Sequence, residues 1–193
     1  MRAAVTSRKN RIHTMAVAAV MTALTCVLAP LSVPVGAVPL TFANLSIYLS
    51  LYLLGWKLGT VSYAVYVCIG MVGMPVFSGF SGGLGKLLGP TGGYILGWIP
   101  AAVLAGLVID RCRGRFPQFL GLAAGTAVCY ALGTVWFCTA TDTALRAGFG
   151  ICVLPFIPGD LVKIALVLAA GSTLREKLGK AGVLTACGLQ RKR

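Results

Sequence analysis

Acidic residues are scarce in this sequence. Asp and Glu together number 4 among 193 residues, there is a single His, and charged residues make up 11% of the chain. Carboxylate oxygens are preferred ligands of Mg²⁺, so this scarcity excludes a Mg²⁺-dependent transferase. The apolar segments also lack the series of Asp, Glu or His side chains that a proton relay through a membrane needs.

The 7 Cys residues form no metal-binding pattern. The sequence contains no Cys-x-x-Cys, and most Cys residues fall inside apolar segments, where Cys behaves as a small hydrophobic side chain. His13, the single histidine, has no partner at the spacing of metal ligands. We therefore predict neither a metal site nor a cofactor.

Apolar residues, by contrast, are abundant. Hydrophobic residues make up 58% of the chain, and the mean hydropathy is +0.88, whereas a soluble domain has about 45–50% apolar residues. This composition excludes a cytosolic enzyme, a disordered segment and a secreted disulfide scaffold. The sequence therefore predicts an integral membrane protein whose single domain covers residues 1–193.

Six apolar segments have the length and composition expected of membrane-crossing helices. A helix needs about 20 apolar residues to span a bilayer, and its backbone must be satisfied internally, which predicts an all-α bundle. The second segment is short and polar at its start, and Pro155 and Pro158 interrupt the sixth near its start. The six segments are residues 12–33, 43–55, 58–74, 92–109, 119–138 and 151–173.

The positive charges fix the predicted orientation of these segments. The chain has 17 Lys and Arg residues and a formal net charge of +13, and the cations lie between the apolar runs rather than along one stripe. This distribution favours a role in topology over nucleic-acid binding. With both termini in the cytoplasm, the outer loops hold only Lys86 and Arg146, and Lys163 lies within the sixth segment. We predict a core of about 12–178 between basic cytoplasmic tails, 1–11 and 179–193. At the predicted membrane interfaces, an aromatic belt would include Tyr48, Tyr52 and Trp56.

Residues 33–44, between the first two segments, differ from plain membrane helix. Pro34 and Pro39 exclude a regular helix there. Thr41 and Asn44 bring hydrogen-bonding groups to the start of the second segment. These residues serve either a rigid turn with a helix N-cap at Thr41 or Asn44, or a binding site.

Residues 73–94, between the third and fourth segments, form a long loop that is both glycine-rich and apolar. Phe77 and Phe80 argue against disorder, and Gly82 and Gly83 argue against a helix. Irregular backbone at membrane depth persists only where protein buries it or where it lines a cavity. The loop therefore favours a lid or a re-entrant segment over a cavity.

Residues 155–163 place an acid and a base at the outer end of the sixth segment. Asp160 and Lys163 are spaced i, i+3 and so share one helix face, and Pro158 with Gly159 indicates a helix start. Ionisable residues within a span face the bundle interior or a wet cavity, which makes this pair a candidate site. The alternative is a self-neutralising pair that only fixes helix packing.

Together, these three regions predict one outer pocket for a small molecule. Lys163 and Lys86 suit a carboxylate, and Asp160 suits N–H donors. We place Lys163 with Asp160 at a polar head, and Lys86 or loop amides at an acid end. An apolar body between them would pack against Phe42, Phe80, Tyr94 and Trp98. No ATPase motif is present, so uphill transport would need a partner that supplies energy.

Small residues recur on one face of the first segment at Ala16, Ala19 and Ala23. Such a face allows a second helix to approach closely in lipid. The pattern fits packing inside the bundle and docking onto a separate protein equally well.

In four motifs, the sequence resembles the BioY family, whose members are the biotin-binding S components of energy-coupling factor transporters. The likeness extends over about residues 10–180. The motifs read Val38-Pro-Leu-Thr41, Gly70-Met-Val-Gly-Met-Pro-Val-Phe77, Phe80-Ser-Gly-Gly-Leu-Gly-Lys-Leu-Leu-Gly-Pro-Thr-Gly-Gly-Tyr94 and Pro155-Phe-Ile-Pro-Gly-Asp-Leu-Val-Lys163.

The resemblance implies a non-enzymatic protein of the cell membrane with a six-helix S-component fold and an outward-facing vitamin pocket. It implies that the Ala face of the first segment docks on a membrane-embedded coupling protein driven by two cytoplasmic ATPases. A stand-alone facilitator or secondary carrier of biotin or a similar small acid is the alternative. A membrane enzyme is a weaker alternative, because the sequence shows no nucleophile with a neighbouring base. The implied biotin contacts are Asp160, Lys163, Tyr94, Lys86, Gly82, Gly83, Thr41, Phe80 and Asn44.

The sequence departs from the family pattern at one position. The family often has Gln two residues after the Thr of the first motif, and this chain has Ala43. The contact made by that Gln is then either absent or replaced by Asn44.

Overall fold

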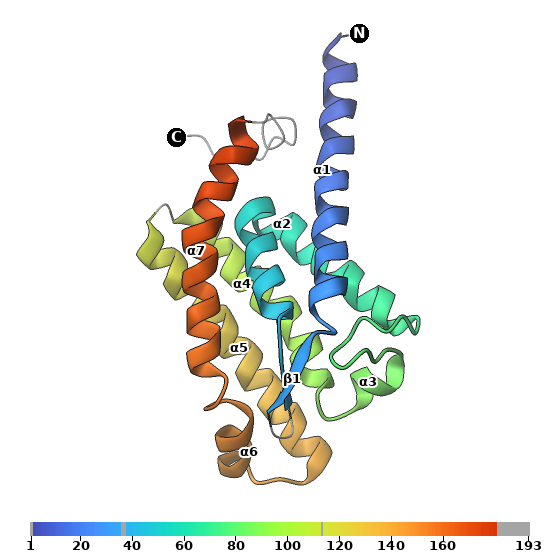
Figure 1. Ribbon diagram of the computed structural model, residues 1–193, viewed down its shortest axis with the longest axis vertical. Helices are drawn as coiled ribbons and strands as arrows, with labels where there is room; N and C mark the ends of the chain where they lie inside the picture. The colour runs from blue at the N-terminus through green and yellow to red at the C-terminus, as the bar shows by residue number, and fades with distance from the viewer. Residues whose placement is uncertain (1, 36–37, 113, 181–193) are drawn as a thin grey trace.

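The computed structural model describes residues 2–35, 38–112 and 114–180, and within them the chain is mostly helical (Figure 1). The predicted basic tail lies outside the described residues from 181 onward, whereas residues 2–11 belong to the first helix. The elements are α1 (Arg2–Leu28), β1 (Ser32–Val35), β2 (Val38–Thr41), α2 (Ala43–Met71), α3 (Leu84–Leu88), α4 (Gly92–Arg111), α5 (Arg115–Thr141), α6 (Leu145–Cys152) and α7 (Ile157–Lys180).

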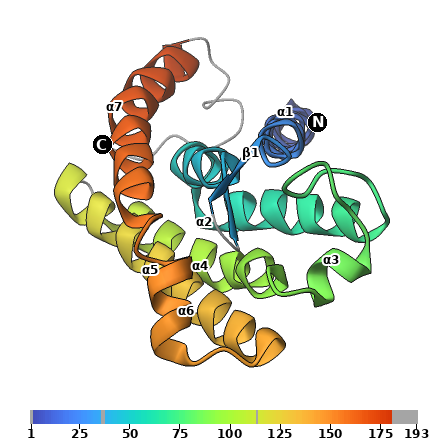
Figure 2. The ribbon, with the colours of Figure 1, turned by 60° about the horizontal axis from the view of Figure 1, so that its bottom comes forward.

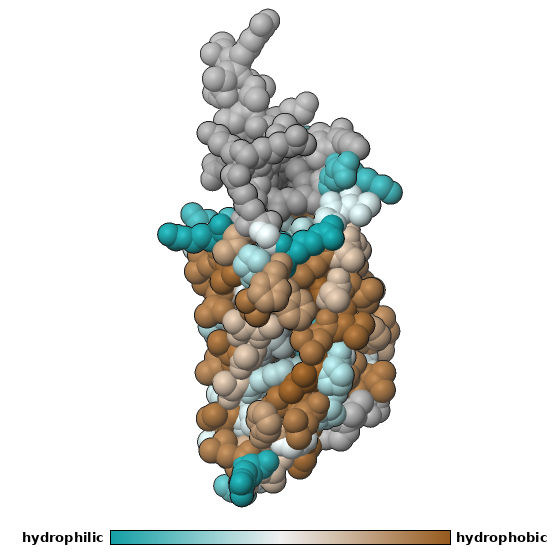
Figure 3. Space-filling model, turned by 90° about the vertical axis from the view of Figure 1, so that its left-hand side faces the viewer, coloured by the Kyte–Doolittle hydropathy of each residue, from teal (hydrophilic) through white to brown (hydrophobic). Residues whose placement is uncertain are grey.

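Four helices of the described chain are long and apolar enough to cross a membrane: α2, α4, α5 and residues Ile157–Leu178 of α7. The apolar part of α1, Ile12–Leu28, is shorter. Figure 3 shows an apolar face with hydrophilic side chains at its lower end and along its upper boundary. These features confirm a helical multi-pass membrane protein.

The predicted second and third segments form a single helical element with a sharp kink. Gly55, inside α2, has φ 77° and ψ 179°, a backbone conformation that is essentially restricted to glycine. Figure 2 shows the first half of α2 nearly end-on and the second half lying across the view. The Asp110 carboxylate of α4 accepts a hydrogen bond from the Trp56 N–H at 3.0 Å. The predicted break between residues 55 and 58 is therefore a turn at Gly55, and the second half ends at Met71 instead of residue 74.

Residues 32–35 and 38–41 are the two paired strands of a β-hairpin, which was not predicted from the sequence. Ser32 pairs with Thr41 and Pro34 pairs with Pro39 in an antiparallel two-stranded sheet. The two prolines prevent a helix, as expected, but a two-stranded hairpin tolerates them because each strand has a free edge. The hairpin lies at the end of the molecule opposite the start of α1 (Figure 1) and carries Thr41 directly to the start of α2.

Two tyrosines of α2 lie in the core, so their predicted place in an interfacial belt is wrong. Tyr48 is fully buried, and its ring contacts Trp98 edge-on at a centroid distance of 5.4 Å. Its hydroxyl group bonds Thr126 of α5 at 2.6 Å. Tyr52 is also buried and packs against Gly171. Because a Thr partner satisfies the Tyr48 phenol, the first half of α2 can be enclosed by other helices.

Helices α4 and α5 make the most extensive contact in the fold, through small residues. A Cβ atom on Gly125 would lie 2.8 Å from both the Ala101 carbonyl oxygen and the Ala105 Cβ. Gly121 and Gly133 similarly accept Val108 and Tyr94. Small residues let helices in a membrane approach until their backbones are in van der Waals contact.

The predicted sixth segment, 151–173, is two helices. Helix α6 ends at Cys152 and α7 begins at Ile157. The helix start predicted at Pro158 and Gly159 is confirmed, and it places Asp160 in the first turn of α7. A carboxylate there is favoured by the partial positive charge of the helix N-terminus.

We expect Gly55→Ala to destabilise the protein by about 1–3 kcal/mol. A Cβ atom at this position would lie 2.9 Å from Asp110 Oδ2, and the left-handed φ is strained for any other residue. Thermal unfolding in detergent should show a lower midpoint. Gly150→Ala, in α6 with open space around it, is the matched control and should leave the midpoint unchanged or raise it slightly, because Ala favours a helix. Equal midpoints for the two variants would contradict the kink.

Candidate functional site

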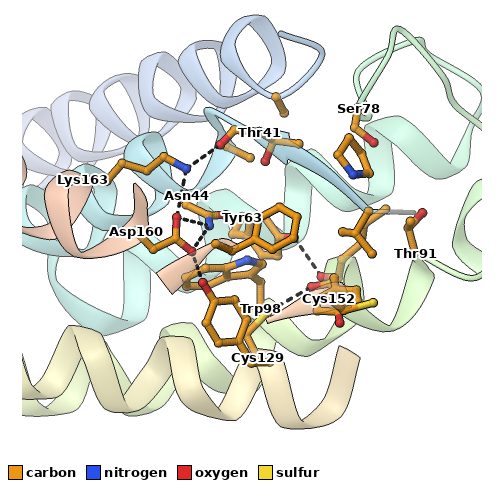
Figure 4. Close-up of a pocket in the computed structure, with 18 of the residues that line it drawn as sticks. Thr41, Asn44, Tyr63, Ser78, Thr91, Trp98, Cys129, Cys152, Asp160 and Lys163 are labelled. Atoms are coloured by element: carbon orange, nitrogen blue, oxygen red, sulfur yellow. Dashed lines mark hydrogen bonds and ion pairs between the residues drawn. The ribbon is translucent and has the colours of Figure 1, made fainter. Parts of the chain in front are cut away.

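A pocket of about 90 Å³ lies at the hairpin end of the molecule, where the hairpin, α2, α4, α5 and α7 converge. Figure 4 shows polar side chains at one side of it and aromatic rings beside them. Its lining is mixed: the residues are Ala29, Val38, Pro39, Thr41, Ala43, Asn44, Tyr63, Tyr66, Ser78, Thr91, Tyr94, Ile95, Trp98, Cys129, Tyr130, Cys152, Phe156, Asp160 and Lys163.

A buried ion pair forms the polar side of this pocket. Lys163 Nζ lies 2.9 Å from Asp160 Oδ1, and both residues are less than a tenth exposed. Lys163 also donates a hydrogen bond to the Thr41 carbonyl oxygen at 2.9 Å. The hairpin is therefore tied to the first turn of α7 through its main chain, and the Thr41 hydroxyl group plays no part in that contact.

Two further side chains complete the contacts of Asp160. Asn44 Nδ2, in the first turn of α2, donates to Oδ1 at 3.1 Å and to Oδ2 at 3.0 Å. The Tyr130 hydroxyl of α5 donates to Oδ2 at 2.6 Å. With the Lys163 contact, these occupy the roughly four acceptor positions of a carboxylate. Four elements thus converge on one acid: the hairpin, through Lys163, together with α2, α5 and α7.

The charges of Asp160 and Lys163 cancel locally, and one N–H of the Lys163 ammonium group makes no contact within the described residues. An ammonium group carries three N–H bonds, and the two contacts of Lys163 within the described residues use two of them. The sequence left open whether Asp160 and Lys163 form a binding site or only neutralise each other. The two alternatives are compatible, because the pair neutralises itself and also lines a cavity. Such a pair suits a neutral polar group better than a second full charge.

Aromatic rings form the apolar part of the pocket, and protein groups hold their hydroxyls. Tyr63 donates to the Ile95 carbonyl at 2.8 Å, and Tyr66 donates to the Val76 carbonyl at 3.2 Å. The Tyr94 hydroxyl bonds Thr134 at 2.9 Å. With these phenols already satisfied, the pocket offers apolar ring surface at this part of its wall.

Ser78 and Thr91 lie across the pocket from Asp160 and Lys163 (Figure 4). Neither hydroxyl group forms a hydrogen bond with another residue in the described part of the chain. Thr91 is the N-cap of α4, and Ser78 belongs to the glycine-rich loop. This end of the pocket therefore has hydroxyl donors that are not committed elsewhere.

The glycine-rich loop folds over the hairpin end of the bundle. Phe77 is fully buried, and its N–H donates to the Ser81 carbonyl at 2.8 Å. The Gly79 N–H donates to the Pro30 carbonyl at 3.2 Å, and the Gly83 N–H donates to the Gly70 carbonyl at 2.7 Å. The loop is thus held by main-chain contacts and by one buried ring, and of residues 73–90 only Ser78 lines the pocket.

Four predicted contact residues of this region do not line the pocket. Phe80 is 67% exposed with φ 55°, and Lys86 lies on α3. Gly82 is held against the Met74 carbonyl, and Gly83 caps α3. Phe42, which was expected to pack against a ligand, is 41% exposed and also lies outside the lining. The structure does bring together Asp160, Lys163, Asn44, Thr41, Tyr94 and Trp98.

Tyr130 is the functional candidate that sequence reasoning missed. A signal was present: Thr126, Tyr130 and Thr134 recur every four residues through an otherwise apolar helix, so they share one face. Each of them forms a side-chain hydrogen bond to another helix, as described above. A polar row of this kind in a membrane span indicates a face turned toward the bundle interior.

The small residues Ala16, Ala19 and Ala23 lie on the exposed face of α1. The packed face of α1 carries Thr22 and Thr25 instead, and Thr22 Oγ1 bonds Ser62 Oγ of α2 at 2.9 Å. Packing of the Ala face inside the bundle, one of the two alternatives from the sequence, is therefore wrong.

Known proteins of similar sequence are biotin transporters. The "Biotin transporter BioY" of Thermotoga maritima is 40% identical over 161 residues, which cover 83% of this chain and 93% of the relative. The "Biotin transporter BioY" of Rhodobacter capsulatus is 35% identical over 160 residues, 75% of this chain and 83% of the relative.

The fold is also known. A crystal structure of the S-component for biotin from an ECF-type ABC transporter superposes with a TM-score of 0.79 at 30% identity. The superposition covers 86% of this chain and 92% of that one. A family model described as the BioY family matches residues 1–180. On the sequence match and the shared fold, the chain belongs to the BioY family.

Proposed function

We propose that the chain is the biotin-binding subunit of an ATP-driven importer of the energy-coupling factor type. The observation that carries the proposal is the buried Asp160–Lys163 pair, with Asn44 and Tyr130, at one side of an otherwise apolar pocket. The names of the relatives and of the matching S-component support biotin as the ligand.

The polar cluster matches the ureido ring of biotin. This ring is uncharged, with two N–H donors and one carbonyl acceptor. The free N–H of Lys163 would donate to the carbonyl. Asp160 would accept one ureido N–H in place of one contact from Asn44, because its acceptor positions are already filled. Asn44 thereby acts as the exchangeable partner, at the position next to Ala43.

The carboxylate of biotin belongs at the other end of the pocket. A neutralised ion pair gives little attraction to a second anion, whereas the Ser78 and Thr91 hydroxyl groups are uncommitted. Lys86 lies on α3, between Ser78 and Thr91 along the chain. We propose that Lys86 approaches the carboxylate, while Tyr94 and Trp98 contact the apolar body.

The pocket is small for a ligand. It measures about 90 Å³, whereas ligand pockets typically measure about 300–1,000 Å³. The loop carries Gly73, Gly79 and Gly83 with positive φ, and its tip exposes Phe80. We propose that the loop swings outward to admit biotin and then closes, so that Phe80, Gly82 and Gly83 contact the ligand in the closed state.

We propose six membrane-crossing helices with both ends in the cytoplasm: α1, the two halves of α2, α4, α5 and α7. The kink at Gly55 divides α2 into two spans, and the start of α1 lies at the same end of the molecule as the end of α7 (Figure 1). The excess of Lys and Arg near those ends supports this orientation in the cell membrane.

The exposed Ala16, Ala19 and Ala23 face of α1 supports docking on a coupling protein of the membrane. Two cytoplasmic ATPases on that protein would supply the energy. The part of this chain that faces them holds basic residues and no nucleotide-binding motif.

We expect Asp160→Ala to weaken biotin binding by about 1.5–3 kcal/mol, the range for a hydrogen bond to a charged group. The loss corresponds to a roughly 10- to 150-fold higher Kd. Isothermal titration calorimetry on the purified chain would measure it. Tyr130→Phe, which removes one contact to Asp160 and keeps the ring, should cause a smaller loss.

Two controls separate binding from folding. Asp142→Ala removes an exposed acid near the same end of the molecule and should leave the affinity unchanged. Tyr48→Phe removes a buried hydrogen bond outside the pocket, so it should lower the unfolding midpoint and leave the affinity unchanged. An Asp160→Ala variant that folds and binds biotin as tightly as the parent would remove Asp160 from the site.

The topology predicts opposite behaviour for two reporter fusions. A fluorescent protein fused after Lys180 should fluoresce, because this reporter folds in the cytoplasm. Alkaline phosphatase fused after Asp142, between α5 and α6, should be active, because this enzyme needs the outer compartment. Phosphatase activity after Lys180 would overturn the orientation.

Transport assays distinguish the proposal from a stand-alone facilitator or secondary carrier. Proteoliposomes that contain this chain alone should bind biotin without accumulating it. Proteoliposomes that also contain a coupling protein and its ATPases should accumulate biotin when ATP is present inside. Uptake by the chain alone at the same rate would favour the facilitator.

A further inference from the structure

A second cavity, a groove of about 570 Å³, lies between α5, α6 and α7. Small side chains of α5 form its floor, at four-residue spacing. Larger apolar side chains of α6, of α7 and of the turn between them form its walls. The floor is Ala123, Ala127, Ala131 and Val135; the walls are Leu145, Phe149, Val153, Ile157, Leu161 and Ile164.

The groove opens toward the bilayer. Its floor runs from Ala123 to Val135 of α5. These 12 helical steps measure about 18 Å, more than half of the roughly 30 Å hydrocarbon layer. Ala127 and Ala131 are exposed, as is Leu161 at 41%. Helices α5 and α7 are both candidate membrane spans.

No polar group in the groove needs water. Its polar lining residues are Thr126, Tyr130, Thr134 and Asp160, and each already has a protein partner. An apolar space of this size does not hold ordered water, and leaving it empty forfeits dispersion contacts along its whole lining. The occupant is therefore apolar.

A charge next in sequence to a wall residue of the groove indicates which apolar group fills it. Arg146 follows the wall residue Leu145 in α6, is exposed, and forms no ion pair with any described residue. A guanidinium group at this position suits a phosphate. We infer that the groove binds one acyl chain of an anionic phospholipid, whose headgroup lies at Arg146.

The bound chain would act on the ligand site, because the groove and the pocket share a wall. Asp160 and Tyr130 line both cavities. An acyl chain behind them excludes water from the rear of the Asp160–Lys163 pair and so maintains the low-dielectric surroundings of its contacts. The lipid site stands independently of the identity of the pocket ligand.

Native mass spectrometry of the full chain tests the inference. After incubation with palmitoyl-oleoyl phosphatidylglycerol, we expect one retained lipid per chain, and at least fivefold less for the phosphatidylcholine with the same chains. Arg146→Gln should abolish this preference. Ala131→Trp, which fills the groove, should lose the lipid and still bind biotin, whereas Ala124→Trp, exposed on α5 outside the groove, should retain it.

A second measurement needs no substitution. Phosphatidylglycerol with a photoreactive group near the end of one acyl chain, reconstituted with the parent protein in vesicles, should label residues 123–135 and 157–164 in preference to exposed positions of α2 and α4. Even labelling of all membrane-facing helices would overturn the inference. So would equal lipid retention by Ala131→Trp and Ala124→Trp, retention of detergent alone, or a dimer that only Ala131→Trp dissociates, which would assign the groove to a second copy.

Discussion

The burial of an acid and a base side by side constrains much of this fold. Removing a carboxylate and an ammonium group from water costs several kcal/mol per ion, and only close contacts with good geometry repay it. Asp160 and Lys163 obtain those contacts from α2, from α5 and from the main chain of the hairpin. The start of α7, the end of the hairpin and the start of α2 are therefore held in register by one cluster.

Different kinds of contact hold the helices and the glycine-rich loop in place. Helices α4 and α5 touch through glycines such as Gly125, where no side chain could be added without displacement. The glycine-rich loop, in contrast, is held mainly by main-chain hydrogen bonds and the Phe77 ring. Breaking a few such contacts costs less free energy than separating packed helices, so the loop is held less firmly than the α4–α5 contact.

Several features of the fold were readable in advance because each depends on residues close in sequence. The apolar segments, the helix start at Pro158 and Gly159, and the i, i+3 placement of Asp160 and Lys163 are local properties. The hairpin and the separate helix α6 were missed. Short apolar segments have too little periodicity to reveal their secondary structure. A glycine kink inside one helix gives the same sequence pattern as a break between two helices.

The sequence by itself determined a positively charged, helical membrane protein with one acid and one base near the end of a span, and four motifs typical of the BioY family. Only the tertiary structure decided that Tyr130 and Asn44 complete the contacts of Asp160, that Tyr48 is core, and that Lys86 and Phe80 lie outside the pocket wall. The reason is physical. A side chain's partners across helices depend on the rotation and depth at which those helices pack, and these quantities follow from the whole set of contacts rather than from any local pattern.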